Sequence, residues 1–271
     1  MKLYKFKSGT KDDIDALLDD KLWVSTLVLM NDPTDLGFYI GNEYEDKDII
    51  SFQEALNLSV VVASFANIIQ NRRLWNYYSN GMKGLVLTYR LEDLADAFAH
   101  FGDKYGTRII KGTVSYGAEK YDLTTEFEKY VKSGMIPNLG KDLGLLFHKD
   151  ESWKDEKEYR IALYLGKENK EKGFLLNKIR PYEVGIGYRI ASGDYEKIKG
   201  WCVENQVTLR KYTPDFKDRK SNSPFKAELI VKGRVEKTLP VLDQEENDFD
   251  DIEIDENEFM KLLMDDKKME V

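Results

Sequence analysis

The chain has 271 residues, a formal net charge of −8, and 42% hydrophobic and 12% aromatic residues. A chain of this length and composition can bury a sizeable core, so disorder along its whole length is excluded. Two histidines and a single cysteine, Cys202, exclude a disulfide framework and a metal site built from several thiolates. One isolated cysteine fits a reducing compartment, and we expect a cytoplasmic protein.

The predicted helices and strands follow one another irregularly. In chain order we expect a strand at 3–6, a helix at 12–20, an extended segment at 22–30, a helix at 52–57, a strand at 58–65, a helix at 73–78, a strand at 85–89, a helix at 91–100, a strand at 108–116, helices at 125–132 and 143–148, strands at 158–165 and 182–186, a helix at 195–204, and strands at 207–212 and 227–231. Ser8 or Thr10 is expected to cap the first helix. Because strands and helices do not alternate, the pattern favours a mixed α+β domain over a doubly wound parallel sheet.

The apolar stretches of the sequence are short. A membrane-spanning helix needs roughly 18 apolar residues, whereas the longest apolar runs, 24–30 and 58–66, are both interrupted by hydroxyl side chains. Residues 1–7 are basic and lack the apolar centre of a signal peptide. We therefore expect no association with a membrane.

Negative charge is concentrated at the end of the chain. Residues 241–271 hold 13 acidic and 3 basic side chains, a net charge of −10, which leaves +2 for residues 1–240. Self-repulsion and lack of apolar residues predict a largely disordered tail after a single domain over 1–240. Residues 258–264 place apolar side chains at helical spacing, so they form either a short helix that docks on the domain or a partner, or a frayed, solvated end.

Residues 210–226 mix positive charge with aromatic rings. The basic residues are Arg210, Lys211, Lys217, Arg219, Lys220 and Lys226, interleaved with Tyr212, Phe216 and Phe225. Two prolines and the sequence Ser-Asn-Ser predict a loop. Such a loop is either a nucleic-acid contact, through phosphates and stacked bases, or an ordinary solvated surface.

No common catalytic fingerprint is present, and the most informative charged cluster lies at 153–160. If a strand begins near Glu156, then Glu156, Glu158 and Arg160 share one face, because strand side chains alternate. Glu158 and Arg160 would then be close enough to interact. A carboxylate held on a rigid strand can stabilise positive charge in a sugar ring. The competing interpretation is an exposed strand face with ion pairs.

A second cluster joins a strand end to an aromatic helix. Ser64 and Phe65 end the strand, and Arg72, Arg73, Trp75 and Tyr78 follow. Aromatic faces can stack on a flat ring such as nicotinamide, and arginines suit phosphates. The alternative for the two larger rings is core packing. A histidine-dependent mechanism would have to use His100 or His148, and both are expected to be structural.

The order and spacing of several short motifs resemble a bacterial family, domain-of-unknown-function family 2971. These motifs are Leu3-Tyr4-Lys5-Phe6, Leu22-Trp23-Val24-Ser25, Asn31-Asp32-Pro33-Thr34-Asp35, Ser64-Phe65, Trp75, Tyr78, Lys83-Gly84, Lys149, Trp153, Glu156 and Glu158-Tyr159-Arg160. The resemblance covers most of residues 1–190. The chain departs from the family pattern at Thr34, Ala66 and Tyr77, where an aromatic residue, a serine and a histidine are common.

More distantly, the layout is similar to ADP-ribosyltransferases of the DNA-modifying toxin type. The matching positions are Tyr4-Lys5, Ser25, Ser64-Phe65 through Tyr78, and Glu158, with Lys5 in place of the usual histidine or arginine. This similarity implies a mixed, mostly antiparallel split sheet with flanking helices, NAD as a substrate and no metal. It also implies transfer of ADP-ribose to a nucleic acid or protein, as by a bacterial toxin or an anti-phage defence effector.

The same similarity implies roles for individual residues. Glu158, or Glu156 as second choice, would stabilise the cation that forms when the nicotinamide–ribose bond breaks. The residues expected to bind NAD are Tyr4, Lys5, Ser25, Ser64, Phe65, Arg72, Arg73, Trp75 and Tyr78. Lys5 would contact the adenosine ribose or the diphosphate, and Arg72 or Arg73 the pyrophosphate.

Two other functions stay open at this point. One is a non-catalytic module whose rings and Glu/Arg positions bind a ligand and whose tail recruits an inhibitory or antitoxin protein. The other is a nuclease toxin in which Asp32, Asp35 and Glu158 hold magnesium, which only the fold could bring together.

Overall fold

The computed structural model describes residues 1–30, 36–41, 44–105, 109–118, 120–135, 140–165, 173–216 and 224–234. Contacts divide the chain into two units, Met1–Arg234 and Val235–Val271. The predicted acidic tail and its amphipathic end therefore lie outside the described residues. Among the residues that are described, no helix has the length and apolar character needed to cross a bilayer.

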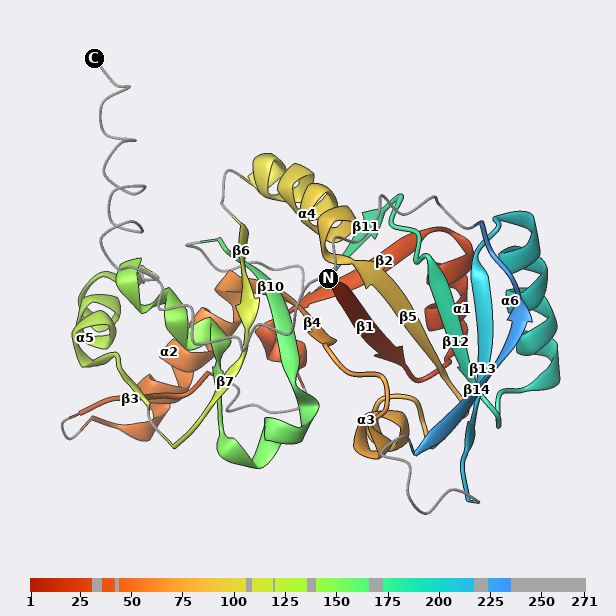
Figure 1. Cartoon of the computed structure of the whole chain (residues 1–271). Coiled ribbons are helices and arrows are strands. Elements are labelled where there is room, and N and C mark those ends of the chain that lie inside the picture. The colour runs from red at the N-terminus through yellow and green to blue at the C-terminus, as the bar shows by residue number, and fades with distance from the viewer. Residues whose placement is uncertain are drawn as a thin grey trace, which may run out of the picture. The chain divides into compact units, whose positions relative to one another are not determined.

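The described part is an α+β domain with a large, mostly antiparallel sheet (Figure 1). Its elements are β1 (Lys2–Lys7), α1 (Lys11–Leu18), β2 (Lys21–Thr26), η1 (Leu27–Leu29), β3 (Phe38–Tyr39), α2 (Asp46–Ser59), β4 (Val60–Ala66), α3 (Arg72–Tyr77), β5 (Leu85–Arg90), α4 (Leu91–Tyr105), β6 (Ile109–Thr113), β7 (Ser115–Tyr116), β8 (Tyr121–Asp122), α5 (Thr124–Ser133), η2 (Gly140–Phe147), β9 (His148–Lys149), η3 (Glu151–Glu156), β10 (Glu158–Tyr164), β11 (Gly173–Asn177), β12 (Glu183–Gly187), α6 (Ser192–Glu204), β13 (Thr208–Pro214) and β14 (Phe225–Val231). The η elements are 3-10 helices. The predicted fold class is thus confirmed.

The strand order of the large sheet is β11-β2-β4-β1-β5-β12-β13-β14, with β10 and β6 joined to it through β4. Its recorded pairings are antiparallel except β12 with β13. Two small parallel pairs, β3 with β8 and β7 with β9, lie beside it. A parallel pair needs a long crossover, and α6 supplies it between β12 and β13.

Strand β4 is the branch point of the sheet. Its seven residues pair with β10 along their whole length. Beyond that, β4 pairs with β2 at Val61 and Val62, and with β1 at the single position Tyr4–Ala66. The strand therefore lacks a recorded ladder partner around Ser64 on the side of β1 and β2. This gap between β1 and β4 is where the candidate site described below forms.

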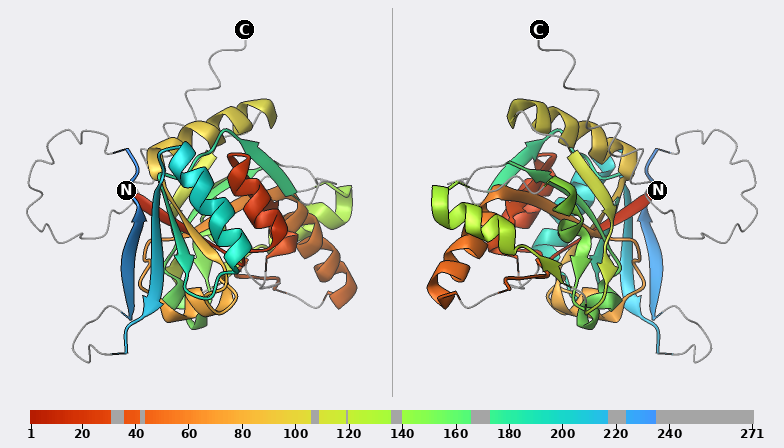
Figure 2. Two further views of the ribbon diagram at one scale, coloured as in Figure 1. Left: turned by 90° about the vertical axis from the view of Figure 1, so that its right-hand side faces the viewer. Right: turned by 90° about the vertical axis from the view of Figure 1, so that its left-hand side faces the viewer.

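Both faces of β4 are buried, which explains why its sequence is apolar and rich in valine apart from Ser64. Val61, Ala63 and Phe65 belong to a core that α1, α4 and α6 cover, and Figure 2 shows α1 and α6 side by side on this face. Val60 and Val62 face a second core that α2, α5 and η2 complete. A buried-strand pattern in the sequence thus corresponds to a strand packed between two layers of helices.

Local sequence explains how the first and third helices begin. The Thr10 side chain accepts a hydrogen bond from the Asp13 amide, and the Asp13 carboxylate accepts one from the Thr10 amide, which forms a capping box. Asn71 caps α3 by accepting from the amides of Arg73 and Leu74. These caps satisfy amides that a helix cannot pair internally.

The strand predicted at 158–165 is β10, which begins at Glu158. A start near Glu156 is excluded, because Glu156 ends a 3-10 helix and Lys157 takes a left-handed φ of 46°. Other predicted elements differ in position or type. The helix expected at 143–148 is a 3-10 helix followed by β9, so His148 lies on a strand. The helix expected at 52–57 is the longer α2, and β3, β8 and β11 were not predicted.

Candidate functional site

Four buried charged side chains form one network beside the gap between β1 and β4. Lys149 Nζ lies 2.8 Å from Glu156 Oε2 and 2.6 Å from Glu158 Oε1. Arg160 Nε donates to Glu158 Oε2 over 2.8 Å. The exposed fraction is 3% for Lys149, 7% for Glu156, 5% for Glu158 and 0% for Arg160. Each charge is thus compensated within the network, as burial requires.

Three short elements bring these side chains together. Glu158 and Arg160 lie on the same face of β10, two residues apart, so their predicted ion pair is confirmed. The competing interpretation, an exposed strand face with ion pairs, is wrong, because this face of β10 is buried. Lys149 comes from β9 and Glu156 from the last position of η3, whose end turns the carboxylate back toward β10.

Further hydrogen bonds fix the network in place. Arg160 Nη1 donates to the Leu146 carbonyl over 3.0 Å, and the Tyr116 hydroxyl accepts from the Glu158 amide over 2.8 Å. The Lys149 ammonium lies 4.7 Å from the centre of the Trp153 ring, within the range of a cation–π contact. The carboxylates therefore stand on a rigid framework.

The pKa values of Glu156 and Glu158 are shifted in opposite directions. Burial alone would raise the pKa of Glu158, but the positive charges of Arg160 and Lys149 outweigh it and hold that pKa well below its usual range. Burial and the neighbouring Glu158 raise the pKa of Glu156, although Lys149 and Tyr78 oppose the rise. The ionised form is therefore favoured more strongly at Glu158 than at Glu156, and Glu156 is the better proton acceptor of the pair.

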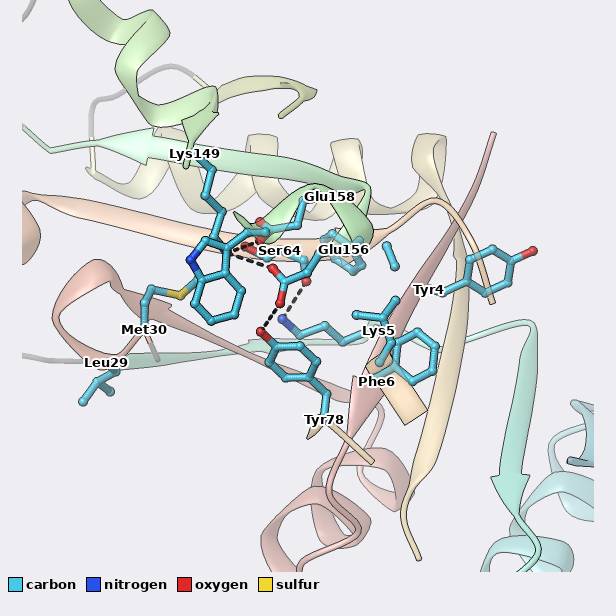
Figure 3. A pocket seen from close by; sticks show the side chains of 14 residues that line it. Tyr4, Lys5, Phe6, Leu29, Met30, Ser64, Tyr78, Lys149, Glu156 and Glu158 are labelled. Carbon is cyan, nitrogen blue, oxygen red and sulfur yellow. Dashed lines mark hydrogen bonds and ion pairs between the residues drawn. The ribbon is translucent and has the colours of Figure 1, made fainter. Parts of the chain in front are cut away.

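A cavity of about 200 Å³ opens between this network and strand β1. Figure 3 shows Lys5, Tyr78 and Glu156 pointing toward one another inside it. Its lining residues are Tyr4, Lys5, Phe6, Leu29, Met30, Ser64, Phe65, Ala66, Leu74, Tyr78, Lys149, Trp153, Glu156 and Glu158. The Tyr78 hydroxyl donates to Glu156 Oε1, so one aromatic ring and one carboxylate are joined at the wall.

Lys5 is the cationic side chain that β1 contributes to the cavity. Its Nζ donates to the Ser64 carbonyl over 2.8 Å, at the position where β4 lacks a ladder partner. Burial, together with the nearby charge of Lys7, lowers the pKa of Lys5 to about 7, while Glu158 opposes the fall. At neutral pH the amine exchanges readily between its charged and neutral forms, and a bound anion would favour the charged form.

A second cavity of about 540 Å³ adjoins the first. Leu74, Tyr78, Trp153 and Glu156 line both cavities. The second cavity also has Arg73, Tyr77, Ser152 and Asp155 in its wall, and Arg73 forms an ion pair with Asp155. We call the two adjoining cavities together the cleft; its first part has the buried carboxylates in its wall, and its second part has the more exposed Arg73.

Most residues predicted to bind NAD line this cleft. Tyr4, Lys5, Ser64, Phe65, Tyr78, Glu156 and Glu158 line the first cavity, and Arg73 lines the second. Arg72 points away, into a separate cavity on the other side of α3. Ser25 pairs opposite Val62 in the sheet and lines neither part of the cleft.

The expectation that Trp75 walls the site is corrected by its position. Trp75 is fully buried in a third core, where its ring packs against Phe6, Tyr212 and Phe225. Its indole nitrogen donates to the Ile69 carbonyl. Core packing therefore explains Trp75. The ring that lines the cleft, where Trp75 was predicted, is that of Trp153.

Sequence reasoning found no chemical role for Lys149 or Trp153. Both appear in the motif set that carries the family resemblance, but neither follows a spacing that marks a known chemistry. Lys149 becomes important only because β9 places its ammonium between two carboxylates from other elements. A lysine preceding two glutamates by seven and nine residues gives no hint of this arrangement.

The segment at 210–226 is only partly a loop. Residues 217–223 lie outside the described residues, but β13 and β14 occupy both ends of the segment. Tyr212 and Phe225 are buried, and Arg210 pairs with Glu183, so these three side chains do not form a free binding surface. Phe216, in contrast, is 87% exposed.

Asp32 and Asp35, the carboxylates of the predicted magnesium site, also lie outside the described residues. Within the ranges that are described, no three His, Cys, Asp or Glu side chains gather as a metal site requires. The nuclease interpretation therefore gains no support here and stays a prediction.

Comparison with known proteins adds one similarity. Residues 74–161 match the model of a family described as "Protein of unknown function (DUF2971)". The matched segment includes Tyr78, Lys149, Glu156 and Glu158, so it supports the family resemblance seen in the sequence. No curated protein and no solved structure matches the chain.

Proposed function

We propose that this protein transfers ADP-ribose from NAD to a macromolecule. The observation that carries the proposal is the buried Glu158 carboxylate, held by Lys149 and Arg160 at the wall of a cleft that also presents Lys5 from β1 and aromatic rings. The proposed reaction needs a fixed negative charge beside a developing cation. The similarity to ADP-ribosyltransferases in the sequence supports the same assignment.

The proposed first step breaks the bond between nicotinamide and ribose C1. Nicotinamide leaves with the bonding electron pair, and the ribose becomes an oxocarbenium-like cation. Glu158 Oε1 accepts a hydrogen bond from Lys149 and Oε2 accepts one from Arg160, and a carboxylate oxygen can accept more than one. A hydrogen bond from the ribose 2′-hydroxyl to this carboxylate would orient the ribose, and its negative charge would stabilise the cation.

The second step forms a bond between ribose C1 and an oxygen or nitrogen of the acceptor. The acceptor proton must leave at this stage, and Glu156 is suited to take it because its pKa is raised by burial. Glu156 lines both cavities, so it can face the ribose and an arriving acceptor. The hydrogen bond from Tyr78 would hold its carboxylate in the required direction.

The cleft is large enough for a dinucleotide to be divided between its two parts. Nicotinamide and its ribose would occupy the cavity of about 200 Å³, between Tyr78 and Trp153. The pyrophosphate would extend into the cavity of about 540 Å³, where Arg73 would exchange Asp155 for phosphate oxygens. Lys5 would contribute a second cation from β1.

The test is incubation of purified protein with NAD labelled in the adenosine part and, separately, in nicotinamide, with mixed cellular RNA, DNA and protein as acceptors. We expect nicotinamide release and label in one acceptor fraction. Glu158→Gln should lower both by about 100- to 1000-fold, the usual effect of losing one preorganised electrostatic contact. Failure of NAD to raise the melting temperature, with no nicotinamide release, would refute the proposal.

A non-catalytic ligand-binding module is the second candidate, and one observation favours it. Both oxygens of Glu158 are already engaged by Lys149 and Arg160, as in a purely structural network. On this alternative the cleft binds NAD or another anion without chemistry. A rise in melting temperature with NAD but no release of nicotinamide would establish it.

A further inference from the structure

Helix α3 has a second cavity on its far side. This cavity, of about 340 Å³, lies among α3, the turn that carries Gly81 and Met82, the end of β12 and the facing ends of β13 and β14. Its lining residues include Arg72, Asn76, Tyr188, Arg189, Asp215 and Phe216. Arg72 and Asn76 are four residues apart and so share one face of α3. Arg73 and Tyr77, on another face, line the candidate cleft.

The two arginines of this cavity have no recorded carboxylate partner. Four of the other described arginines are ion-paired: Arg73 with Asp155, Arg160 with Glu158, Arg180 with Asp20 and Arg210 with Glu183. Arg189 donates to the Gly81 carbonyl over 3.3 Å, and Arg72 has no ion pair within the described residues. Both side chains are exposed, so their guanidinium groups are available to an anion.

The carboxylate in the cavity does not cancel these charges. Asp215 lies 3.3 Å from Lys226 Nζ and is largely buried. That pair is neutral as a unit. Two positive charges therefore remain at the cavity, which favours a polyanion over a neutral ligand.

The cavity also has exposed rings at its edge. Phe216 is 87% exposed and Tyr188 is 43% exposed. Exposed aromatic faces beside guanidinium groups are the arrangement that holds single-stranded nucleic acid, through stacked bases and contacted phosphates. An acidic peptide would use the charges but would have no comparable need for the two rings.

The arginine at the end of β12 is rigidly placed. Gly187 lies so close to the neighbouring turn that an added Cβ would be 2.2 Å from the Met82 carbonyl oxygen. The Arg189 amide donates to that same carbonyl over 3.0 Å. Because this backbone is fixed against the turn at Met82, the Arg189 side chain starts from a defined point, which lowers the entropy cost of binding.

We infer that the cavity of Arg72, Arg189, Tyr188 and Phe216 is a binding site for single-stranded nucleic acid. The site goes beyond the proposed transfer reaction, since binding needs no NAD. The site is separate from the candidate cleft, since the two are lined by different residues of α3.

The test measures binding of fluorescently labelled 12-nucleotide oligo(dT) and oligo(U) by anisotropy over a series of salt concentrations, without NAD. The double variant Arg72→Ala/Arg189→Ala should lose at least about tenfold in affinity, and its salt slope should fall by about 0.7 for each lost phosphate contact. Phe216→Ala should weaken binding by about tenfold through lost stacking. The control Lys129→Ala/Lys132→Ala removes two exposed charges on α5 and should bind as the unmodified protein does.

Three results would overturn the inference. The first is no binding of either oligonucleotide at low salt. The second is equal affinity and salt slope in the arginine double variant and the α5 control. The third is displacement of the oligonucleotide by a poly-glutamate peptide of equal charge together with no effect of Phe216→Ala, which would assign the cavity to an acidic protein. Because NAD is absent, none of these results depends on the proposed transferase activity.

Discussion

Lys149 Nζ donates to Glu158 Oε1 over 2.6 Å, and both side chains are buried. The same ammonium also contacts Glu156, so one cation compensates two carboxylates of unlike acidity. Lys149 lowers the pKa of both carboxyl groups, but at Glu156 the rise caused by burial and by Glu158 prevails. The network is therefore both a structural element of the domain and the centre of the proposed chemistry.

Removing Lys149 should destabilise the fold strongly. Lys149→Met leaves two buried carboxylates without their shared cation, and we expect a loss of about 3–5 kcal/mol in the free energy of unfolding. Lys154→Met, which breaks an exposed pair with Glu151, is the control and should cost less than about 1 kcal/mol. Urea denaturation measures both, and similar losses in the two variants would contradict the prediction.

Substitutions of Glu156 and Glu158 should affect nicotinamide release and transfer to the acceptor differently. Glu156→Gln is expected to retain nicotinamide release to water but to slow transfer to the acceptor by about 100- to 10,000-fold, as loss of a general base does. Glu158→Gln should slow both reactions. Single-turnover measurement of released nicotinamide and of labelled acceptor distinguishes the variants. Equal effects of both substitutions on both reactions would rule out the division of roles.

Trp75 should contribute mainly to the stability of the fold, and Trp153 mainly to the binding of NAD. Trp75→Ala removes a fully buried ring and should cost about 3–5 kcal/mol of stability. Trp153→Ala removes a partly exposed ring at the cleft and should cost much less, but it should diminish the rise in melting temperature that NAD produces. If Trp153→Ala destabilises the protein as much as Trp75→Ala does, Trp153 is a core residue as well.

Lys5 should make stability depend on pH above neutrality. Its pKa is about 7 in the folded protein, against an ordinary value of 10.5, so the unfolded chain binds more protons between these values. Stability should therefore rise with pH from about 7, by at most about 1.4 kcal/mol per pH unit from this group. Urea denaturation at pH 7, 8 and 9 should show a smaller rise in Lys5→Met. Parallel profiles for the two proteins would show that Lys5 titrates normally.

The sequence by itself determined the fold class, because periodicity and the irregular order of helices and strands reflect which faces can be buried. It also identified the ion pair of Glu158 with Arg160, since alternation along one strand is a local property. The predicted start of that strand at Glu158 is also confirmed, but the left-handed backbone at Lys157, which keeps Glu156 off the strand, depends on how η3 meets β10.

Tertiary structure alone decided which residues from distant segments meet. Lys149 gained its importance from the position of β9 relative to β10. Trp75, and not Trp153, lies in a core because α3 directs its ring there, and Trp153 lines the cavity. Arg72 and Arg73 are adjacent in sequence yet line different cavities, since a helix separates neighbouring side chains by direction. Local patterns encode burial and secondary structure, whereas a site depends on distances between elements that only packing establishes.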